Sequence, residues 1–453
     1  MHTAVFDIGK TNKKFSIFDE NLQEIHRHYI TLPETKDEDG FPTEDLPLLT
    51  EWMQEELRKA MQSDKFHISK LNFSTYGASF VHLNECGLPV APLYNYLKPF
   101  PEELWNEFYQ IAGTNEEYCV STASPALGML NSGLQLYWLQ KKRPEIFEQI
   151  KYSLHFPQYC SYLFSKYLWS DFTSIGCHTG LWDFTKKDYH TWVKQSGIDA
   201  LFPSTVLATH TTQAMVNGQL VEVGTGIHDS SAALLPYIVS SEESFLLLST
   251  GTWNITFNPF SQELLTSSDL HKDCLNYMRM DGLPVKASRL FFGSEFNIQT
   301  QKMTDHFGKT EHKYHHTIIF DEELFKKWNQ VQEPLFHLET IQYPDQSIAF
   351  ASETRWDLFP TFEDAYHRFM IEMMHLQTNA IQLAAGSMPI QKLYVDGGFT
   401  QNDLFVHLLR MAFPTCELII SPSPLGSSLG AAMAINSPET VKNYTFGTKR
   451  VTL

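Results

Sequence analysis

Basic residues are scarce in this 453-residue chain. Its 34 lysines and arginines are outnumbered by 52 aspartates and glutamates, and the formal net charge is −18 at pH 7. Proteins that bind nucleic acid neutralise its phosphates with stripes of basic side chains, and the sequence contains no such stripe. No nucleic-acid partner is therefore expected. A small anionic ligand would have to be held locally, by backbone N–H groups, helix ends or a divalent cation.

Cysteine is also sparse, and long apolar runs are absent. The six cysteines show neither a Cys-x-x-Cys pair nor a metal-ligand spacing, so reduced, mostly buried thiols are expected. No apolar run is long enough to span a membrane. The first strand is expected within four residues of the start, without an apolar leader core. We expect a cytoplasmic protein with no membrane partner.

Length and composition indicate more than one folded unit. A chain of 453 residues exceeds one compact core, so two domains, or two halves around a cleft, are expected. Hydrophobic residues make up 43% and charged residues 19%, and these globular values argue against disorder. Segments with strand and helix periodicity alternate in the first half, which favours an α/β fold. The expected strands lie near 3–8, 14–19, 70–75 and 80–84, and the expected helices near 45–62, 101–112 and 133–150.

The same kind of pattern starts again near residue 244. No low-complexity linker separates the two parts, and the polar stretch 238–244 is the expected boundary. The chain is thus predicted to form domains 1–240 and 241–453. The second domain is expected to contain strands within 244–259, helices near 321–331 and 363–385, and a strand followed by a helix within 392–413.

Each half begins with an apolar strand, a polar turn that contains glycine, and a second apolar strand. The turn is Asp7-Ile-Gly-Lys-Thr-Asn12 in the first half and Ser249-Thr-Gly-Thr-Trp-Asn254 in the second. A further echo links residues 70–77 with 392–398, each a lysine-led strand ending in glycine. Two interpretations stay open, an internal repeat or a coincidence of common strand-turn-strand patterns.

The first turn by itself also has two interpretations. It is either a β-hairpin whose lysines are solvated, or a phosphate site. An acid at a strand end, a glycine and exposed backbone N–H groups can hold a metal-bound phosphate.

Further segments make the pattern more specific. The two turns, together with "GIHDSSAALLP" at 226–236 and "VDGGFTQNDLF" at 395–405, resemble the FGGY family of carbohydrate kinases. Residues 156–190 resemble the family's helix followed by a strand hairpin, and 423–433 its late glycine-containing helix. The resemblance covers nearly the whole chain in the right order. It is closest to the rhamnulokinase and fuculokinase branch, through 72–90 and the His-Asp pair that precedes "SSAALLP".

This resemblance implies a fold and an activity. The fold would be two actin-like or hexokinase-like (ribonuclease H-like) domains around a central catalytic cleft, with the sugar held mainly by the first and ATP mainly by the second. The activity would be that of a transferase of carbohydrate metabolism. It would be an ATP- and Mg²⁺-dependent kinase acting on a terminal hydroxyl of a rhamnulose-like or fuculose-like ketose or of a polyol. The expected partners are the sugar and ATP, and a homodimer is allowed.

The resemblance also assigns roles to residues of the first domain. Asp7 would hold the metal, although a strand-end acid could simply cap the hairpin. Asp229 would be the general base that accepts the proton of the sugar hydroxyl, a role that can coexist with that of a helix N-cap. His228 would contact the sugar, the alternative being an ordinary buried histidine. The segment Gly77, Ala78 and Ser79 would complete the sugar site.

A second set of residues would bind the nucleotide. Seven of its members come from the two turns, and the other three from the glycine pair after the 392–396 strand and the helix that follows it. The set is Gly9, Lys10, Thr11, Asn12, Thr250, Gly251, Thr252, Gly397, Gly398 and Asn402. Residues outside this set have other expected roles: solvated side chains for Lys13 and Lys14, core packing for Trp253, and helix packing for Gly426 and Gly430.

Two segments depart from the family pattern and leave the sugar unidentified. Where the rhamnulokinase branch has Trp-Gly-x-Asp, this chain has Tyr-Gly-Ala-Ser at 76–79, so Ser79 replaces a carboxylate. The family's aromatic, Asp and Arg pattern is replaced by Tyr-Asn-Tyr-Leu at 94–97. Both changes remove charged partners for sugar hydroxyls.

Two other functions compete with a kinase. A catalytically silent sugar or nucleotide sensor on the same fold would have no physical need for both Asp7 and Asp229. A hydrolase using His228 and Asp229 as an acid–base pair would leave the two phosphate-type turns unexplained.

Overall fold

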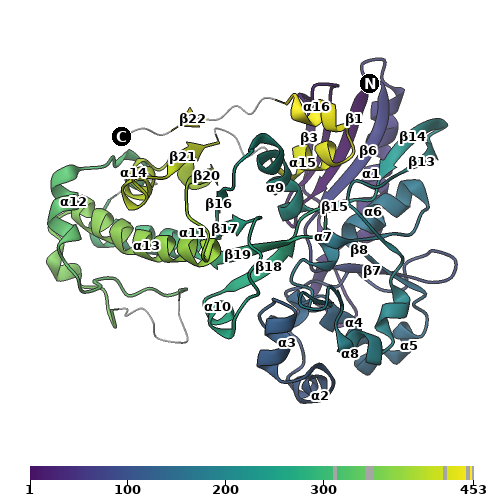
Figure 1. Cartoon of the computed structure of the whole chain (residues 1–453), viewed down its shortest axis with the longest axis horizontal. Helices are drawn as coiled ribbons and strands as arrows, with labels where there is room; N and C mark the ends of the chain where they lie inside the picture. Colours follow the sequence, from purple (N-terminus) through teal and green to yellow (C-terminus); the bar gives the residue numbers. More distant parts are fainter. Residues whose placement is uncertain (310–313, 342–350, 422–425, 445–448, 451–453) are drawn as a thin grey trace.

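Two seven-stranded sheets organise the computed structural model, one in each half of the chain (Figure 1). The structure describes all residues except 310–313, 342–350, 422–425, 445–448 and 451–453. The first sheet has the order β13-β14-β6-β1-β2-β3, with β15 also paired to β6. Its strands are β1 (His2–Ile8), β2 (Lys13–Phe18), β3 (Glu24–Ile30), β6 (Ile68–Thr75), β13 (Thr211–Val216), β14 (Gln219–Gly224) and β15 (Ile227–His228).

The second sheet has the order β18-β19-β17-β16-β20-β21-β22. Its strands are β16 (Leu246–Thr250), β17 (Asn254–Asn258), β18 (Cys274–Met278), β19 (Pro284–Leu290), β20 (Lys392–Gly397), β21 (Glu417–Ile420) and β22 (Lys449–Arg450). The turn 7–12 connects the hairpin strands β1 and β2, and the turn 249–254 connects β16 and β17. The first strand of each hairpin pairs in parallel with the strand of a lysine-led segment, β1 with β6 and β16 with β20. The next strand outward is parallel again. Of the two interpretations that the sequence left open, the shared strand arrangement favours the repeat.

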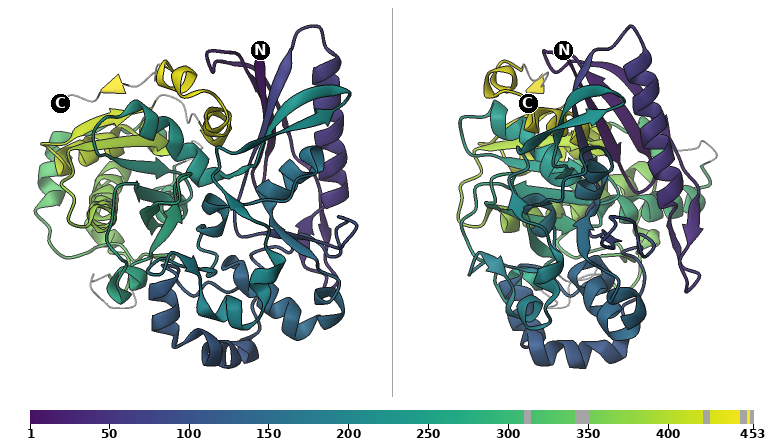
Figure 2. Two further views of the ribbon diagram at one scale, coloured as in Figure 1. Left: turned by 45° about the vertical axis from the view of Figure 1, so that its right-hand side comes forward. Right: turned by 90° about the vertical axis from the view of Figure 1, so that its right-hand side faces the viewer.

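Helices cover both faces of each sheet, as Figures 1 and 2 show. The helices of the first half are α1 (Leu46–Gln62), α2 (Glu102–Ala112), α3 (Asn115–Ser121), α4 (Gly133–Lys142), α5 (Pro144–Phe147), α6 (Phe156–Ser165), α7 (Phe172–Ile175), α8 (Thr191–Gln195) and α9 (Asp229–Ser240). Those of the second are α10 (Ser267–His271), α11 (Phe292–His306), α12 (Glu322–Asn329), α13 (Phe362–Ala385), α14 (Asp403–Ala412), α15 (Gly426–Ala434) and α16 (Pro438–Lys442).

Short elements complete the chain. Four two-stranded pairs are β4 (Glu34–Lys36) with β5 (Pro42–Glu44), β7 (Phe80–Leu83) with β8 (Tyr152–His155), β9 (Ser170–Asp171) with β12 (Thr205–Val206), and β10 (Trp182–Asp183) with β11 (Asp188–Tyr189). The 3₁₀ turns are η1 (Gly128–Leu130), η2 (Ile198–Leu201), η3 (Tyr314–Thr317), η4 (Trp356–Leu358) and η5 (Gly398–Gln401). Among the described residues, no helix is both long and apolar enough to cross a membrane.

The continuous apolar run of β1 reflects burial on both faces of the sheet. Ala4, Phe6 and Ile8 pack on the side of α1, whereas Val5 points to the opposite side, toward α15. A strand covered by helices on both faces reads as an unbroken apolar run, as this one does. The predicted helix near 133–150 is wrong as a single element. It ends at Arg143 and restarts at Pro144, since proline lacks an N–H and disfavours helical geometry in the residue before it.

Helix α9 of the first half and α15 of the second half pack against each other between the sheets (Figures 1 and 2). Although α15 follows β21 of the second sheet in the chain, it packs with α9 on the first sheet, and Asn72 of β6 donates to the carbonyl oxygen of Ala431 at 2.7 Å. A Cβ placed on Gly430 would lie 1.8 Å from the carbonyl oxygen of Ala232. The predicted packing role of Gly430 is confirmed.

We expect Gly430→Ala to destabilise the protein. Replacing glycine by alanine inside a helix ordinarily stabilises it by up to about 1 kcal/mol, so any loss measures the α9–α15 contact. Overpacking of this kind costs roughly 1–3 kcal/mol. The free energy of unfolding from urea titration tests it. An unchanged or raised stability would show that the two helices are not tightly apposed.

Candidate active site

Three strand ends of the first sheet lie side by side and carry the predicted site residues. In the parallel register, Asp7 of β1 is opposite Ser74 of β6, and His228 of β15 is opposite Thr75. The backbone N–H of Tyr76 donates to the carbonyl oxygen of Ile8 at 3.1 Å. Carboxyl ends of parallel strands meet at one edge of a sheet, so the residues that follow them share a site.

Asp7 is held by four contacts from two elements. The Ser427 hydroxyl donates to both carboxylate oxygens, at 2.8 and 2.7 Å, and the Ser428 hydroxyl donates to Oδ2 at 2.8 Å. The Lys14 ammonium lies 3.1 Å from the same Oδ2. The prediction that Lys14 is solvated is therefore wrong. The hairpin register offered a signal, because residues 7 and 14 are cross-strand partners in it. The two serines gave no such signal.

Lys13 is buried and supports the first turn from below. Its ammonium donates to the carbonyl oxygens of Gly9 and Lys10, at 3.2 and 3.1 Å, and to Glu44 at 3.0 Å. The expectation of a solvated Lys13 is wrong, since two carbonyl oxygens of the turn and the carboxylate of Glu44 accept from its buried ammonium group. The Gly9 N–H also donates to the Asn12 carbonyl oxygen at 3.0 Å, which closes the turn.

The remaining polar side chains of this turn reach outward. Lys10 donates to Glu34 of β4 at 2.7 Å. The Asn12 side-chain oxygen accepts from the Thr31 hydroxyl at 3.4 Å. Thr11 and Asn12 are both exposed. The turn therefore presents exposed side chains on a backbone that Lys13 holds in shape.

Asp229 begins α9 immediately after β15. Its Oδ1 accepts from the Ser230 N–H at 2.6 Å, and about a third of the side chain is exposed. Burial, followed by repulsion from the charge of Asp7, raises the pKa of Asp229 to about 7. The structure thus brings the two predicted carboxylates into one electrostatic environment.

His228 is a buried neutral imidazole beside this carboxylate. Its Nε2 lies 3.1 Å from Asp229 Oδ1 and 3.1 Å from Cys177 Sγ, and its ring is parallel to Tyr277 at 5.6 Å. Burial lowers the pKa of His228 to about 3. Gly77 permits this arrangement, since a Cβ there would lie 2.4 Å from Cys177 Sγ. Cys177 is a neighbour that the sequence analysis missed.

The other two residues of the 77–79 segment are buried. Ala78 adopts a left-handed backbone with φ +57°, and its carbonyl oxygen accepts from Gln135 at 2.8 Å. Ser79 is 1% exposed, and its hydroxyl has no hydrogen-bond partner among the described residues. These two residues therefore shape the backbone beneath the site.

The second turn lies at the mouth of a cavity of about 780 Å³ in the second half. Gly251 and Thr252 line it from the turn, and Gly398 and Asn402 line it from the segment that follows β20. Volumes of this size are typical of small-molecule and cofactor sites. The structure therefore brings four of the predicted nucleotide residues together around one cavity.

Two predicted members of that set act within the protein instead. The Thr250 hydroxyl donates to the Asp396 carbonyl oxygen at 2.5 Å and accepts from the Phe399 N–H at 3.1 Å. Gly397 has φ +88°, and a Cβ there would lie 1.9 Å from the Thr250 carbonyl oxygen. Both residues bring β16 and β20 close enough to form the cavity wall.

Asn402 caps α14 by accepting from the Phe405 N–H at 2.9 Å, and it donates to the Tyr366 hydroxyl at 2.7 Å. Trp253 is 40% exposed and stacks on Phe291, so its predicted place in the core is wrong. The wall that sequence reasoning missed comes from α11 and from residues just after it, which carry no recognisable motif. It includes Phe296, Asn297, Thr300, Thr304, His315 and Ile318.

The residues around Asp7 fit a magnesium ion that is shared with a phosphate. No cluster of three or more histidine, cysteine or acidic side chains with metal-site geometry occurs in the described part of the chain. A cation at Asp7 would thus take one carboxylate from the protein and its other ligands from water and phosphate oxygens. Mg²⁺ commonly binds in this way. Gly426 has φ +65° and starts α15 next to Lys14, since a Cβ placed on it would lie 3.8 Å from Lys14 Nζ.

Sequence comparisons agree with this geometry. The N-terminal domain of the FGGY family of carbohydrate kinases matches residues 3–235, and the family's C-terminal domain matches residues 242–443. The chain belongs to the FGGY family of carbohydrate kinases. Rhamnulokinase from Halalkalibacterium halodurans is 24% identical over 256 residues, which are 55% of this chain and 52% of that protein. The chain thus matches about half the length of this relative.

Solved FGGY structures share the fold. A carbohydrate kinase from Novosphingobium aromaticivorans superposes with a TM-score of 0.79 at 23% identity, covering 99% of this chain and 96% of the other. Xylulose kinase from Rhodospirillum rubrum gives 0.78 at 14% identity, with 100% and 94% covered. Plasmodium falciparum glycerol kinase with ADP gives 0.73 at 15% identity, with 97% and 92% covered. The predicted α/β fold of two actin-like domains is confirmed.

We expect ATP to stabilise this FGGY chain clearly with Mg²⁺ and only modestly without it, because an acidic protein needs the cation to neutralise the triphosphate near Asp7. A ligand present at 100 times its Kd stabilises a protein by about 2.7 kcal/mol. Melting temperatures with ATP plus EDTA and with ATP plus Mg²⁺ test this. In Asp7→Asn the increment due to the metal should disappear, whereas equal shifts in the unaltered protein would argue against the site.

Proposed function

We propose that this FGGY chain is an ATP- and Mg²⁺-dependent kinase that phosphorylates a terminal hydroxyl of a neutral ketose or polyol. The observation that carries the proposal is the place of Asp229. It begins α9 directly after β15, which pairs with the same strand, β6, as the strand of Asp7, and its pKa is raised to about 7. A general base works best when its pKa is close to the operating pH. The names of the relatives, rhamnulokinase, xylulose kinase and glycerol kinase, support a sugar or polyol acceptor.

In the proposed reaction the sugar hydroxyl oxygen attacks the γ-phosphorus of ATP while its proton passes to Asp229. The bond between the γ-phosphorus and the bridging oxygen breaks, and ADP leaves. Asp229 then returns the proton to solvent. Lys14 is positioned to stabilise charge on the transferred group, since it already faces Asp7. When bound, Mg²⁺ would neutralise the triphosphate charge and would be held by Asp7.

The nucleotide is proposed to occupy the cavity of the second half. Gly251, Thr252, Gly398 and Asn402 would contact it there, and Thr250 and Gly397 would hold the wall. Gly9, Lys10, Thr11 and Asn12 would approach the phosphates from the first half. A division of the chain at 240/241 would let domains 1–240 and 241–453 close over the substrates, which excludes water from the transfer. A cytoplasmic location and a homodimer stay predictions.

The charges near the strand ends favour a neutral acceptor. All three lysines of the first turn are paired: Lys10 with Glu34, Lys13 with Glu44 and Lys14 with Asp7. His228 is neutral because of its burial. A sugar acid would therefore bring its carboxylate next to Asp229 without a spare cation to balance it. We expect neutral sugars to be phosphorylated in preference to gluconate.

Asp229→Asn should lower sugar phosphorylation by about 10²- to 10⁴-fold, the usual worth of a positioned acid–base group. The amide keeps an oxygen that can accept from the Ser230 N–H, so the start of α9 should persist. ADP release with rhamnulose, fuculose, xylulose, glycerol and gluconate measures the activity.

Asp321→Asn is the matched control, because Asp321 caps α12 far from the strand ends. Asp229 is the first residue of α9, and the N-cap expected at this position is His228 instead. Loss of folding together with activity would give Asp229 only a structural role at the start of this helix. ATP binding without turnover on any acceptor, in the unaltered protein, would identify a silent sensor.

The pH profile should follow the ionisation of Asp229. Its pKa is raised to about 7, chiefly by burial and then by Asp7, so the reactive carboxylate is lost as the pH falls through 7. We expect kcat/KM for the sugar to fall about tenfold per unit below that pH, as it does when one essential base becomes protonated. Steady-state kinetics from pH 5 to 9, with nucleotide binding measured at each pH, check this. A flat profile would exclude Asp229 as the base.

A further inference from the structure

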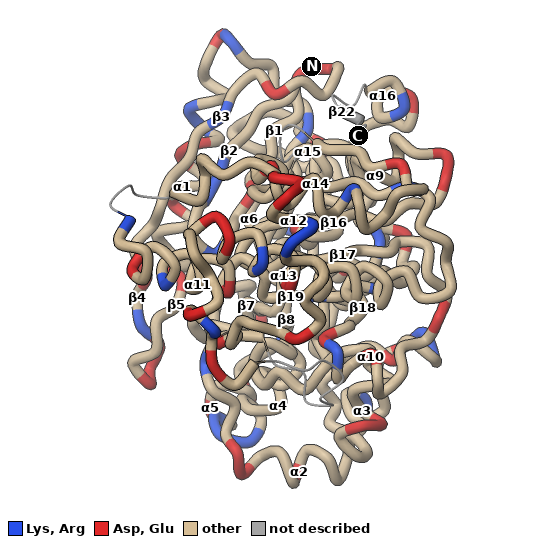
Figure 3. The backbone as a smooth tube through the Cα atoms, turned by 90° about the vertical axis from the view of Figure 1, so that its left-hand side faces the viewer, with Lys and Arg blue, Asp and Glu red and all other residues tan. Residues whose placement is uncertain are grey.

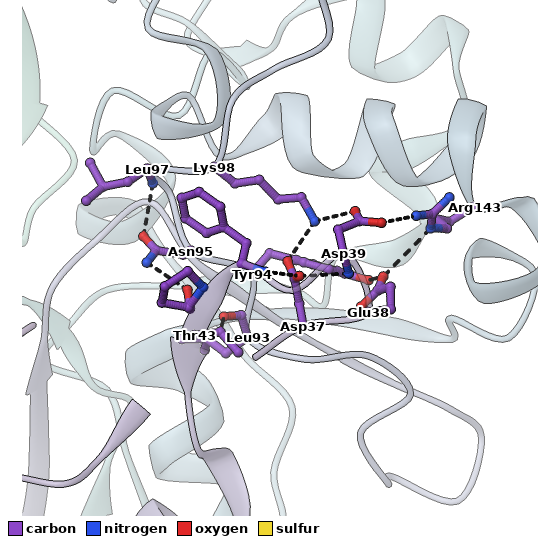
Figure 4. Close-up of polar contacts among 12 residues, drawn as sticks. Asp37, Glu38, Asp39, Thr43, Leu93, Tyr94, Asn95, Leu97, Lys98 and Arg143 are labelled. Atoms are coloured by element: carbon purple, nitrogen blue, oxygen red, sulfur yellow. Dashed lines mark hydrogen bonds and ion pairs between the residues drawn. The ribbon is translucent and has the colours of Figure 1, made fainter. Parts of the chain in front are cut away.

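Three side chains of the segment 94–98, those of Tyr94, Asn95 and Lys98, have polar partners within the first half of the chain (Figure 4). The Tyr94 hydroxyl donates to Glu38 at 2.5 Å. The Asn95 amide donates to the Pro42 carbonyl oxygen at 2.9 Å. These contacts fix the segment against the β4–β5 pair.

An ion cluster with a buried Lys98–Asp37 pair and a more exposed Asp39 and Arg143 anchors the end of the same segment. The Lys98 ammonium lies 2.6 Å from both Asp37 and Asp39, and Arg143 lies 2.5 Å from Asp39 (Figure 4). The Lys98 ammonium lies between the two carboxylates and balances their charge, so the cluster is a structural ion pair rather than a metal-cation site. The backbone between Asn95 and Lys98 is therefore held at both ends.

Tyr96 is the exception in this anchored segment. It is half-buried, and no hydrogen bond from the described residues reaches its hydroxyl. Its ring meets the edge of the Tyr76 ring at 5.9 Å. Tyr76 follows β6 directly, between the strand ends that carry Asp7 and Asp229. The aromatic pair thus places Tyr96 above the proposed site of transfer.

The groups that face Tyr96 leave its hydroxyl available as a donor. Burial, and then the charges of Asp229, Glu44 and Glu34, raise the pKa of the Tyr96 phenol, so it stays protonated. The Tyr76 hydroxyl is already bonded to Glu44. Glu34 and Glu44 are paired with lysines of the first turn. Tyr96 is therefore the neutral donor in this group with no partner of its own.

We propose that Tyr96 is a specificity-determining residue of the acceptor site, its ring covering the apolar face of a deoxyketose and its hydroxyl hydrogen-bonding one hydroxyl of that sugar. This inference rests on the proposed kinase function. An aromatic wall with one neutral donor suits a sugar that carries C–H and methyl surface. A three-carbon polyol has no methyl group and offers less C–H surface for the ring to cover.

The test compares Tyr96→Phe with Tyr94→Phe. The second variant is the control, because it removes the neighbouring hydroxyl, which donates to Glu38. With rhamnulose or fuculose, Tyr96→Phe should raise the KM of the acceptor about 2- to 10-fold, the usual effect of losing one neutral hydrogen bond. In Tyr96→Phe, the KM for ATP and the kcat should stay within about twofold of those of the unaltered protein, and the melting temperature should not change. Tyr94→Phe should leave the KM of the acceptor unaltered. Tyr96→Leu should lower the preference for rhamnulose or fuculose over glycerol about tenfold or more.

Each result bears on a different claim. An equal rise in KM for glycerol, for ATP and for the ketose would show a structural role and overturn the inference. An unchanged ketose KM in Tyr96→Phe would also overturn it, while leaving the kinase assignment intact. If the unaltered protein binds Mg²⁺ and ATP but phosphorylates no member of the panel, the proposed function fails and the inference fails with it.

Discussion

The close contact between α9 and α15 is the constraint on which the site depends. Both helices begin at the proposed transfer position: α9 with Asp229, and α15 with the serines that hold Asp7. Because Gly430 lies against the Ala232 carbonyl oxygen, the two helices have little freedom to slide or separate. Two carboxylates that are more than two hundred residues apart in the chain are thereby fixed relative to each other. The contact between Gly430 and Ala232 thus positions Asp7 and Asp229, although neither small residue contacts either carboxylate.

Charge pairing explains why one of these carboxylates differs from the other. Asp7 is neutralised by Lys14 and accepts from two hydroxyls, whereas the partners of Asp229 in the described part of the chain are a neutral imidazole and the N–H and hydroxyl of Ser230. In a buried setting an unpaired carboxylate holds its proton more tightly. Elsewhere the charges are mixed, and on the side of the molecule that Figure 3 shows, acidic and basic residues are scattered among neutral ones. The excess of acid is thus spread over the protein, while the site uses a few specific pairs.

In the anchored segment 94–98, some side chains hold the backbone in place, whereas a neighbouring side chain has no hydrogen bond from the described residues. Hydrogen bonds hold the side chains of Tyr94, Asn95 and Lys98 to residues 37–42 between and within β4 and β5. The Tyr96 ring lies instead against Tyr76, which directly follows β6. A similar division occurs in the first turn, where buried Lys13 holds the backbone that exposes Thr11 and Asn12. In both places a buried ammonium group stabilises a segment that also carries a polar side chain with a proposed role in ligand binding. Such support keeps a loop residue in place without a hydrogen bond of its own.

The sequence by itself determined the α/β architecture, the repeated hairpins and the position of Asp7 and Asp229 at strand and helix ends. These follow from local periodicity and from residues near one another in the chain. It misplaced Lys13, Lys14 and Trp253, because their burial depends on partners that local patterns do not show. Only the tertiary structure decided that Ser427 and Ser428 contact Asp7, that α11 forms a wall of the cavity, and that Tyr96 faces the site. Contacts of this kind are set by how the sheets and the α9–α15 pair pack, and packing between distant segments leaves no periodic trace in the sequence.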